Sequence, residues 1–280
     1  MFSHQNVTEK KDRCQMEAIS GVFKTREDAE RTVKEVRAAG IPSDKVTLLT
    51  PGTTDKIDKE LQSVPVDTAE QAGMGKTFGA VLGGAAGLTS GSLLIALVPG
   101  VGPITALGLL GAAILGTAGA AIGANAGDKL EGFMSQGLPE DEIFVYEDAL
   151  RKGRSVVVAL SDNAGTTALL RDLLRAEGAE TIDAARDQWW IGLRSAEENH
   201  YSASSKNFTE DEKFYRLGFE ASLHARNRCK EFDQVASEMA ATLEDVQRQY
   251  PDAKVEEPFT RGYQRGRKYY QQLCDESKAA

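Results

Sequence analysis

The pattern of apolar and polar positions predicts two similar units, each built from a strand, a helix and a strand. In the first unit, over residues 16–66, "MEAISGVFK" and "DKVTLLTP" are apolar segments rich in strand-forming residues. The helix between them is predicted from a threonine cap, apolar residues at helical spacing and a terminal glycine. These residues are Thr25, Ala29, Val33, Val36 and Gly40.

The second unit repeats this order within residues 138–192. "RSVVVALS" (154–161) predicts a buried strand, a leucine-rich helix then ends at Gly178, and "TIDAARDQWW" (181–190) is predicted as the last strand. A further helix over 139–153 precedes this unit. The duplication predicts an α+β fold class, a ferredoxin-like sandwich whose four-stranded sheet has helices on one face.

A long uncharged segment interrupts the two units. Residues 77–127 contain no Asp, Glu, Lys or Arg, and a Pro- and Gly-rich turn divides this run near its middle. Each half is long enough for a helix of ~33 Å at the usual rise per residue, and the hydrocarbon core of a bilayer is ~30 Å thick. The segment therefore predicts a helical hairpin over residues 67–137. Its turn residues are Pro99, Gly100, Gly102 and Pro103.

Glycines in this hairpin recur at a spacing that places them along one side of a helix. An interior glycine costs a water-exposed helix ~1 kcal/mol relative to alanine, so this regular spacing favours helices whose backbones approach closely. We predict a glycine zipper that drives helix packing and self-association. Its residues are Gly75, Gly79, Gly83, Gly87, Gly91, Gly108, Gly111, Gly116, Gly119, Gly123 and Gly127.

The two ends of the chain differ from the central units. Residues 1–15 are polar and are predicted to form a disordered tail. Residues 193–280 are predicted to be a C-terminal helical region, with helices over 210–226, 230–248 and 256–274. A capping-box signal at Thr209 and Glu212 precedes the first of these helices. The last helix and the first share a weak repeat, in which "YRLGF" (215–219) resembles "FTRGY" (259–263).

Composition and motifs exclude several classes of chemistry. The net charge of −9 argues against non-specific nucleic-acid binding, and three scattered cysteines without a CxxC pair give no metal site or disulfide framework. Gly75-Lys76-Thr77 matches the end of a P-loop, but Glu70 occupies the position of its first glycine. We therefore predict no catalytic residues, no cofactor, no metal and no identified small-molecule substrate.

The first unit and the glycine-rich stretch after it carry a family likeness. "AISGVFKTREDAERTVKEVRAAGIPSDKVTLLTP" followed by apolar, glycine-rich sequence resembles bacterial heat-induced or general stress proteins. The resemblance covers roughly residues 16–190 and consists of layout and a short N-terminal signature. It implies a stress-linked, non-enzymatic role in a bacterium, and no catalytic residue is carried over.

Two hypotheses for function follow from the surroundings of the hairpin. In the first, the hairpin inserts into the cytoplasmic membrane, contacts lipid and drives self-association, with the other parts of the chain facing the cytoplasm. In the alternative, the chain is a soluble, cytoplasmic homo-oligomeric binding or scaffold module with the hairpins buried in a shared core. Both hypotheses predict a homo-oligomer, and neither involves an enzyme.

Overall fold

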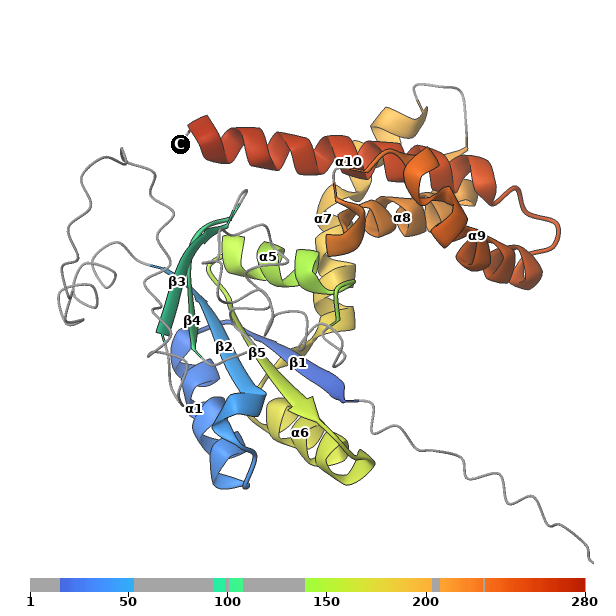
Figure 1. Ribbon diagram of the computed structural model, residues 1–280. Helices are drawn as coiled ribbons and strands as arrows, with labels where there is room; N and C mark the ends of the chain where they lie inside the picture. The colour runs from blue at the N-terminus through green and yellow to red at the C-terminus, as the bar shows by residue number, and fades with distance from the viewer. Residues whose placement is uncertain are drawn as a thin grey trace, which may run out of the picture.

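Six strands form one antiparallel sheet in the computed structural model (Figure 1). Their order is β3-β4-β2-β5-β1-β6. The strands are β1 (Glu17–Phe23), β2 (Val46–Pro51), β3 (Leu93–Val98), β4 (Gly102–Leu107), β5 (Ser155–Ser161) and β6 (Glu180–Thr181). The structure describes residues 16–52, 93–98, 101–107, 139–202, 207–228 and 230–279.

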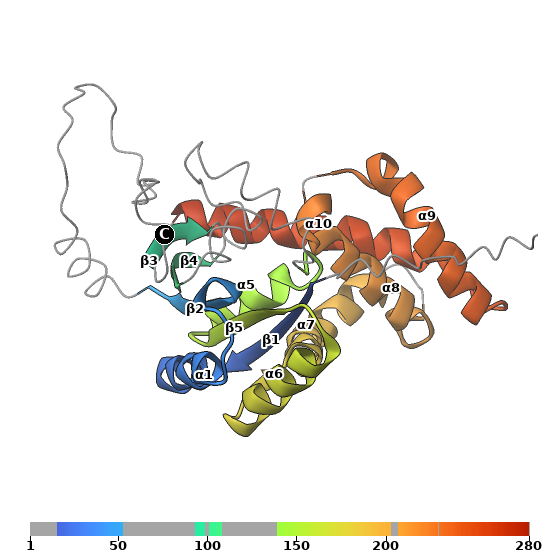
Figure 2. The same cartoon turned by 60° about the horizontal axis from the view of Figure 1, so that its bottom comes forward.

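Helices cover both faces of this sheet, as Figures 1 and 2 show from two directions. Helices α1 and α6 pack on one face, and α5 and α7 pack on the other, where α8, α9 and α10 form a further layer. The sequence predicted helices on one face only. Their bounds are α1 (Arg26–Ala38), α5 (Ile143–Arg151), α6 (Ala164–Ala176), α7 (Ile182–Ser202), α8 (Phe208–Leu223), α9 (Phe232–Gln249) and α10 (Glu256–Ala279). The α+β class is confirmed.

Strand β5 lies in the middle of the sheet and is buried at every position. Because side chains alternate along a strand, Val157 and Ala159 contact the cluster beneath α1 and α6. Val156 and Val158 contact the cluster beneath α5 and α7. The apolar run "SVVVALS" is thus explained by burial on both faces rather than on one.

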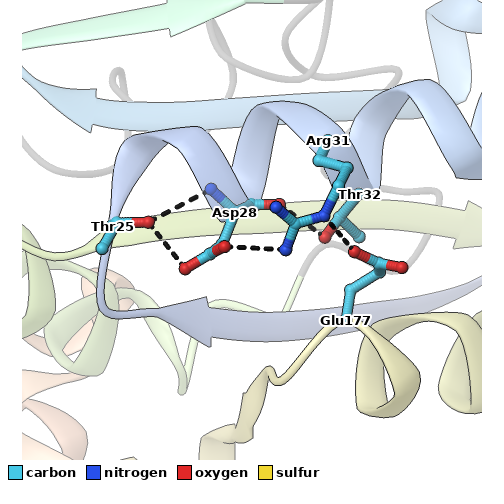
Figure 3. Close-up of polar contacts among 5 residues, drawn as sticks. All are labelled: Thr25, Asp28, Arg31, Thr32 and Glu177. Atoms are coloured by element: carbon cyan, nitrogen blue, oxygen red, sulfur yellow. Dashed lines mark hydrogen bonds and ion pairs between the residues drawn. The ribbon is translucent and has the colours of Figure 1, made fainter.

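Local capping fixes the start of α1, as Figure 3 shows. The Thr25 hydroxyl accepts a hydrogen bond from the Asp28 backbone N–H at 3.1 Å and donates one to the Asp28 carboxylate at 2.7 Å. Arg31 contacts Asp28 at 2.7 Å and Glu177, after the end of α6, at 2.6 Å. The hydrogen bond from Thr25, followed by that from Arg31, holds the pKa of Asp28 below its usual value. The predicted Thr25 cap is confirmed, and the same residues join α1 to α6.

The ends of both helices also follow the sequence signals. Gly40 after α1 and Gly178 after α6 have φ angles of 92° and 82°, a conformation that favours glycine. Asn163 caps α6 by accepting a hydrogen bond from the Thr166 backbone N–H at 2.8 Å. The two units therefore have matching helix starts and stops.

The prediction of a long last strand over residues 181–190 is wrong. Strand β6 contains two residues, and α7 begins at Ile182. Ile182, Ala185 and Trp189 are buried at helical spacing, against the cluster that contains the α5 side chains. Trp189 and Trp190 are therefore core residues of a helical layer and not members of the sheet.

The prediction of a helical hairpin is wrong where the structure describes it. Residues 93–98 and 102–107 are strands of one antiparallel β-hairpin, with Val98 opposite Gly102. Val98, Ile104 and Ala106 are buried in the same apolar cluster as α5. Short apolar runs cannot be assigned to helix or strand from periodicity alone, and here the pairing of β4 with β2 decides for strands.

The membrane placement and the transmembrane-helix assignment are corrected by the same finding. Among residues 16–52, 93–98, 101–107, 139–202, 207–228 and 230–279, no helix combines the length and apolar character needed to cross a bilayer. Val98, Ile104 and Ala106 of the β-hairpin are buried against other parts of the chain. Burial in protein therefore accounts for the lack of charge at these positions.

The C-terminal helices agree with the sequence prediction and contain the closest helix contact among the described residues. A Cβ placed on Gly218 of α8 would lie 1.9 Å from the Phe259 carbonyl oxygen of α10. One placed on Gly262 of α10 would lie 1.9 Å from the Tyr215 carbonyl oxygen of α8. The repeat "YRLGF" and "FTRGY" is thus a reciprocal contact in which each glycine admits the other helix's backbone. The capping box predicted at Thr209 and Glu212 is not formed, since Asn207 is the N-cap.

We expect Gly218→Ala to lower the free energy of unfolding by about 3 kcal/mol, because its Cβ cannot fit against a backbone carbonyl. Gly192→Ala is the matched control, since Gly192 is an exposed glycine within α7 with no heavy atom within 4 Å of an added Cβ. This control should gain about 0.5–1 kcal/mol. Urea unfolding of both variants measures the difference. Equal effects at the two positions would refute the close helix contact.

Candidate functional site

Most of the predicted packing residues lie outside the part of the chain that the structure describes. This holds for the eleven zipper glycines over 75–127 and for Pro99 and Gly100 of the turn. Gly102 and Pro103 are described, and they are the first residues of β4. The glycine zipper therefore stays a prediction, whereas the turn residues that are described belong to a β-hairpin.

Strand β3 forms one edge of the sheet and gives the molecule its most distinctive surface. Among the described residues it pairs with β4 alone, from Leu93 opposite Leu107 to Val98 opposite Gly102. Its sequence, "LLIALV", contains no charged residue, no proline and no glycine. Natural edge strands are usually protected by charges, proline, bulges or short length. β3 has the sequence of an unprotected edge.

The opposite edge of the sheet, strand β6, is protected because it is very short. Strand β6 comprises Glu180 and Thr181 only, and it continues directly into α7. Gly21 of β1 pairs with Thr181 of β6, and a Cβ added to Gly21 would lie 2.8 Å from the Ala179 side chain. A two-residue strand offers few free backbone groups to another chain. The two edges therefore differ in their capacity to accept a further strand.

A cluster of titratable side chains lies where β1 meets the start of α5. Tyr146 donates a hydrogen bond to the Glu142 carboxylate at 2.6 Å, and its hydroxyl lies 2.6 Å from that of Ser20 on β1. Burial raises the pKa of Glu142, against the opposing effect of the Tyr146 hydrogen bond. Burial and the adjacent Glu142 raise the pKa of Tyr146 well above its usual value. The cluster joins α5 to the sheet through three polar side chains.

A second cluster joins α5 to the segment that follows α8. Both carboxylate oxygens of Glu147 accept hydrogen bonds from the Arg228 guanidinium, each at 2.8 Å, and both side chains are buried. The guanidinium also lies 4.8 Å from the ring centroid of Tyr270 on α10. Burial raises the pKa of Glu147, while the ion pair raises that of Arg228. Because arginine stays charged at accessible pH and the contact is bidentate, we assign an ionised pair.

A third cluster connects α7, α8 and α10. The Glu197 carboxylate on α7 accepts a hydrogen bond from the Tyr215 hydroxyl at 2.8 Å and contacts Arg265 at 2.9 Å. Burial and the nearby carboxylate raise the pKa of Tyr215. The acid of each of the three clusters, buried or part-buried, thus has a polar partner on another element, as charges removed from water require. Together these contacts connect the helical layers to the sheet.

A shallow pocket adjoins the second cluster. It has about 220 Å³ of empty space, which includes open solvent, and it is lined by residues of α5, α7, α8 and α10. Because part of that space is open solvent, the enclosed volume is smaller still than the ~300–1,000 Å³ of ligand pockets, and the hollow is small for a substrate. Its charged lining residues are Glu147, which is paired with Arg228, and Arg151, which is paired with Asp148.

The described residues offer little acid–base or metal chemistry. Among them, no group of three His, Cys, Asp or Glu side chains is placed to hold a metal ion. Burial lowers the pKa of His224 to about 4, and its ring stacks on Phe144 with centroids 6.4 Å apart. The imidazole is therefore neutral near pH 7 and packs as an aromatic side chain. Among the described residues, the arrangement supports rigid packing and a sheet edge, β3, that is paired on one side only.

Sequence reasoning missed these clusters for identifiable reasons. Glu147 and Arg228 are 81 residues apart, so no local spacing links them. Arg265 and Glu197 are likewise far apart in sequence, and no local pattern links them. The edge position of β3 depends on its pairing with β4 and on the sheet order. The interpretation of residues 77–98 as a helix overlooked a local signal. The segment "LLIALV" followed by Pro99-Gly100 is typical of a strand and a turn.

We expect Glu142→Gln to raise the melting temperature at pH 7.5. The raised pKa means that folding disfavours the ionised carboxylate, so the stability contributed by Glu142 falls as pH rises from its unfolded pKa, near 4.5, through its folded pKa. The substituted glutamine is neutral throughout and keeps an oxygen that can accept the Tyr146 hydrogen bond. The gain should therefore be largest at neutral pH and disappear toward pH 4.5. Thermal unfolding across this pH range measures the gain.

Glu147→Gln is the control for this experiment, because Glu147 is a buried acid of α5, whereas Glu142 is the part-buried N-cap residue of that helix. Burial raises the pKa of Glu147 as well, but its replacement leaves the Arg228 cation buried without a counter-charge, so Glu147→Gln should destabilise the protein by about 3–5 kcal/mol at pH 7.5. A loss of stability in both variants at pH 7.5 would refute the proposed difference between the two acids.

Comparisons with protein-family models, with curated proteins and with solved structures found no match for this chain. The likeness to bacterial stress proteins over residues 16–190 therefore stays an interpretation of the sequence. The geometry of the described residues, above all the edge strand β3, is what indicates a function.

Proposed function

We propose that this chain is a non-enzymatic binding or scaffold module that works as a homo-oligomer. The observation that supports this function most directly is the edge strand β3, which has one paired side among the described residues and no protecting residue in its sequence. An extended segment that adds to such an edge gains main-chain hydrogen bonds. The edge is therefore a surface suited to assembly.

The rigidity of the rest of the described chain supports the same function. The clusters around Glu142, Glu147 and Glu197 join the sheet to α5 and join the helical layers to one another. Their carboxylates bind side chains of neighbouring elements. A sheet edge held by a firmly packed body loses little conformational entropy when it binds.

We further propose a ferredoxin-like arrangement for the four strands β2-β5-β1-β6 and the helices α1 and α6. The antiparallel order of these strands and the matching caps of α1 and α6 support it. The hairpin β3-β4 then extends this sheet beyond β2. A stress-linked role in a bacterium is proposed from the sequence resemblance, and a cytoplasmic location from the scattered cysteines without a CxxC pair.

Size measurement of the full chain tests the proposed function. The chain has a mass of 30.2 kDa, and we expect size-exclusion chromatography with light scattering, in buffer without detergent, to give a whole-number multiple of at least two. The oligomer should persist as salt rises from about 50 to 500 mM, because the uncharged strand edge has no ion pairs to screen and salt weakens the repulsion between copies of net charge −9.

A mass of 30.2 kDa at all concentrations up to about 100 μM, the level at which weak association becomes visible, would refute the homo-oligomer. A polydisperse aggregate without a defined multiple would also refute it, because a scaffold with closed symmetry has a fixed number of copies.

A further inference from the structure

The backbone of β3 has hydrogen-bonding groups that β4 does not use. In an antiparallel pair, alternate residues direct their N–H and C=O groups to the partner strand, and the residues between them direct theirs to the other side. Three of the six residues of β3 therefore present both groups away from β4. All six residues have an amide N–H, whereas β4 contains Pro103, which lacks one.

The charge distribution of the chain indicates what this edge binds. The net charge is −9, so two copies repel one another over most of their surfaces. Strand β3 lies within residues 77–127, which contain no charged side chain; the nearest charges in sequence are Lys76 and Asp128. The strand itself therefore brings no charged side chain into a contact between two copies.

The sequence of β3 is compatible with a symmetric partner. An antiparallel pair formed by two copies of one strand has a two-fold axis that sets one residue opposite its own copy, and every residue within the overlap faces an apolar residue of "LLIALV". Cross-strand aliphatic pairs stabilise such a contact, and no charged residue stands opposite another. The opposite edge, β6, has two residues and cannot form an equivalent ladder.

We propose that the partner of β3 is β3 of a second copy, added antiparallel across a two-fold axis. The two six-stranded sheets then form one continuous sheet. This inference rests on the proposed function and names the contact through which the homo-oligomer forms. It assigns self-recognition to residues 93–98.

Disulfide trapping in the full chain tests the contact. In a background where Cys14, Cys229 and Cys274 are replaced by serine, Leu94→Cys, Ile95→Cys, Ala96→Cys and Leu97→Cys each place one thiol on β3, so that the four central positions at which the two-fold axis can set a residue opposite its own copy are all tested. Facing residues of antiparallel strands have Cα atoms about 4.5–5.5 Å apart, within the range of a disulfide. We expect copper-phenanthroline oxidation to give a covalent dimer at least tenfold faster in one of these variants than in Ile191→Cys, whose native side chain on α7 is 60% exposed.

A charge variant provides the second measurement. Ile95→Lys places like charges near one another across the two-fold axis, so the dimer dissociation constant should rise at least tenfold. Ile191→Lys adds the same charge on α7 and should leave association unchanged. Circular dichroism establishes that each variant is folded, and if Ile95→Lys does not fold, the trapping experiment decides alone.

The outcomes separate this inference from the proposed function. An oligomer that shows no trapping on β3 above the Ile191→Cys level overturns the β3 contact and leaves the scaffold function standing. A monomer at all concentrations overturns both. Covering of the edge by residues 53–92 or 108–138 of the same chain, or by a different protein, gives no covalent homodimer and overturns the inference.

Discussion

Complete burial of the central strand β5 is the constraint on which the remaining architecture depends. All seven of its residues are buried, and alternation of side chains places apolar groups on both faces of the sheet. Each face therefore needs a helical layer, and the chain supplies α1 and α6 on one side and α5 and α7 on the other. A sandwich with helices on one face would leave Val156 and Val158 in water.

The second helical layer in turn determines where the C-terminal helices attach. Trp189 of α7 contacts Phe144 of α5 with ring centroids 4.9 Å apart, and it contacts Phe219 of α8 at 5.8 Å. Phe219 then contacts Tyr269 of α10 at 5.5 Å. These aromatic contacts stabilise the packing of the helices and tolerate more than one ring orientation. Buried ion pairs add directional contacts at the same boundaries, where Glu147 binds Arg228 between α5 and the segment after α8.

The sequence predicted those parts of the fold whose signals are local. The cap at Thr25, the glycine ends at Gly40 and Gly178 and the three C-terminal helices depend on residues within one or two turns of each other. The last strand failed because residues 182–190 satisfy a helical period that becomes visible only once Ile182, Ala185 and Trp189 are seen packing together. The Glu147–Arg228 ion pair of the second cluster could not be predicted, because its partners are 81 residues apart in sequence. The edge position of β3 could not be predicted, because strand order is a property of the whole sheet.

Lack of charge in a segment signals burial, but it does not identify the surrounding medium. Gly218 and Gly262 allow backbone contact between two helices, and Gly262 is followed by charged residues within two turns, including Arg265, which pairs with Glu197. Close glycine packing therefore occurs here inside the protein, between helices that also carry charged side chains. Conversely, the uncharged residues 93–98 and 102–107 form strands, although their apolar character also suits lipid. The pairing of β4 with β2 distinguishes burial in protein from burial in lipid. A strand that pairs with the central sheet has its backbone hydrogen-bond partner inside the protein.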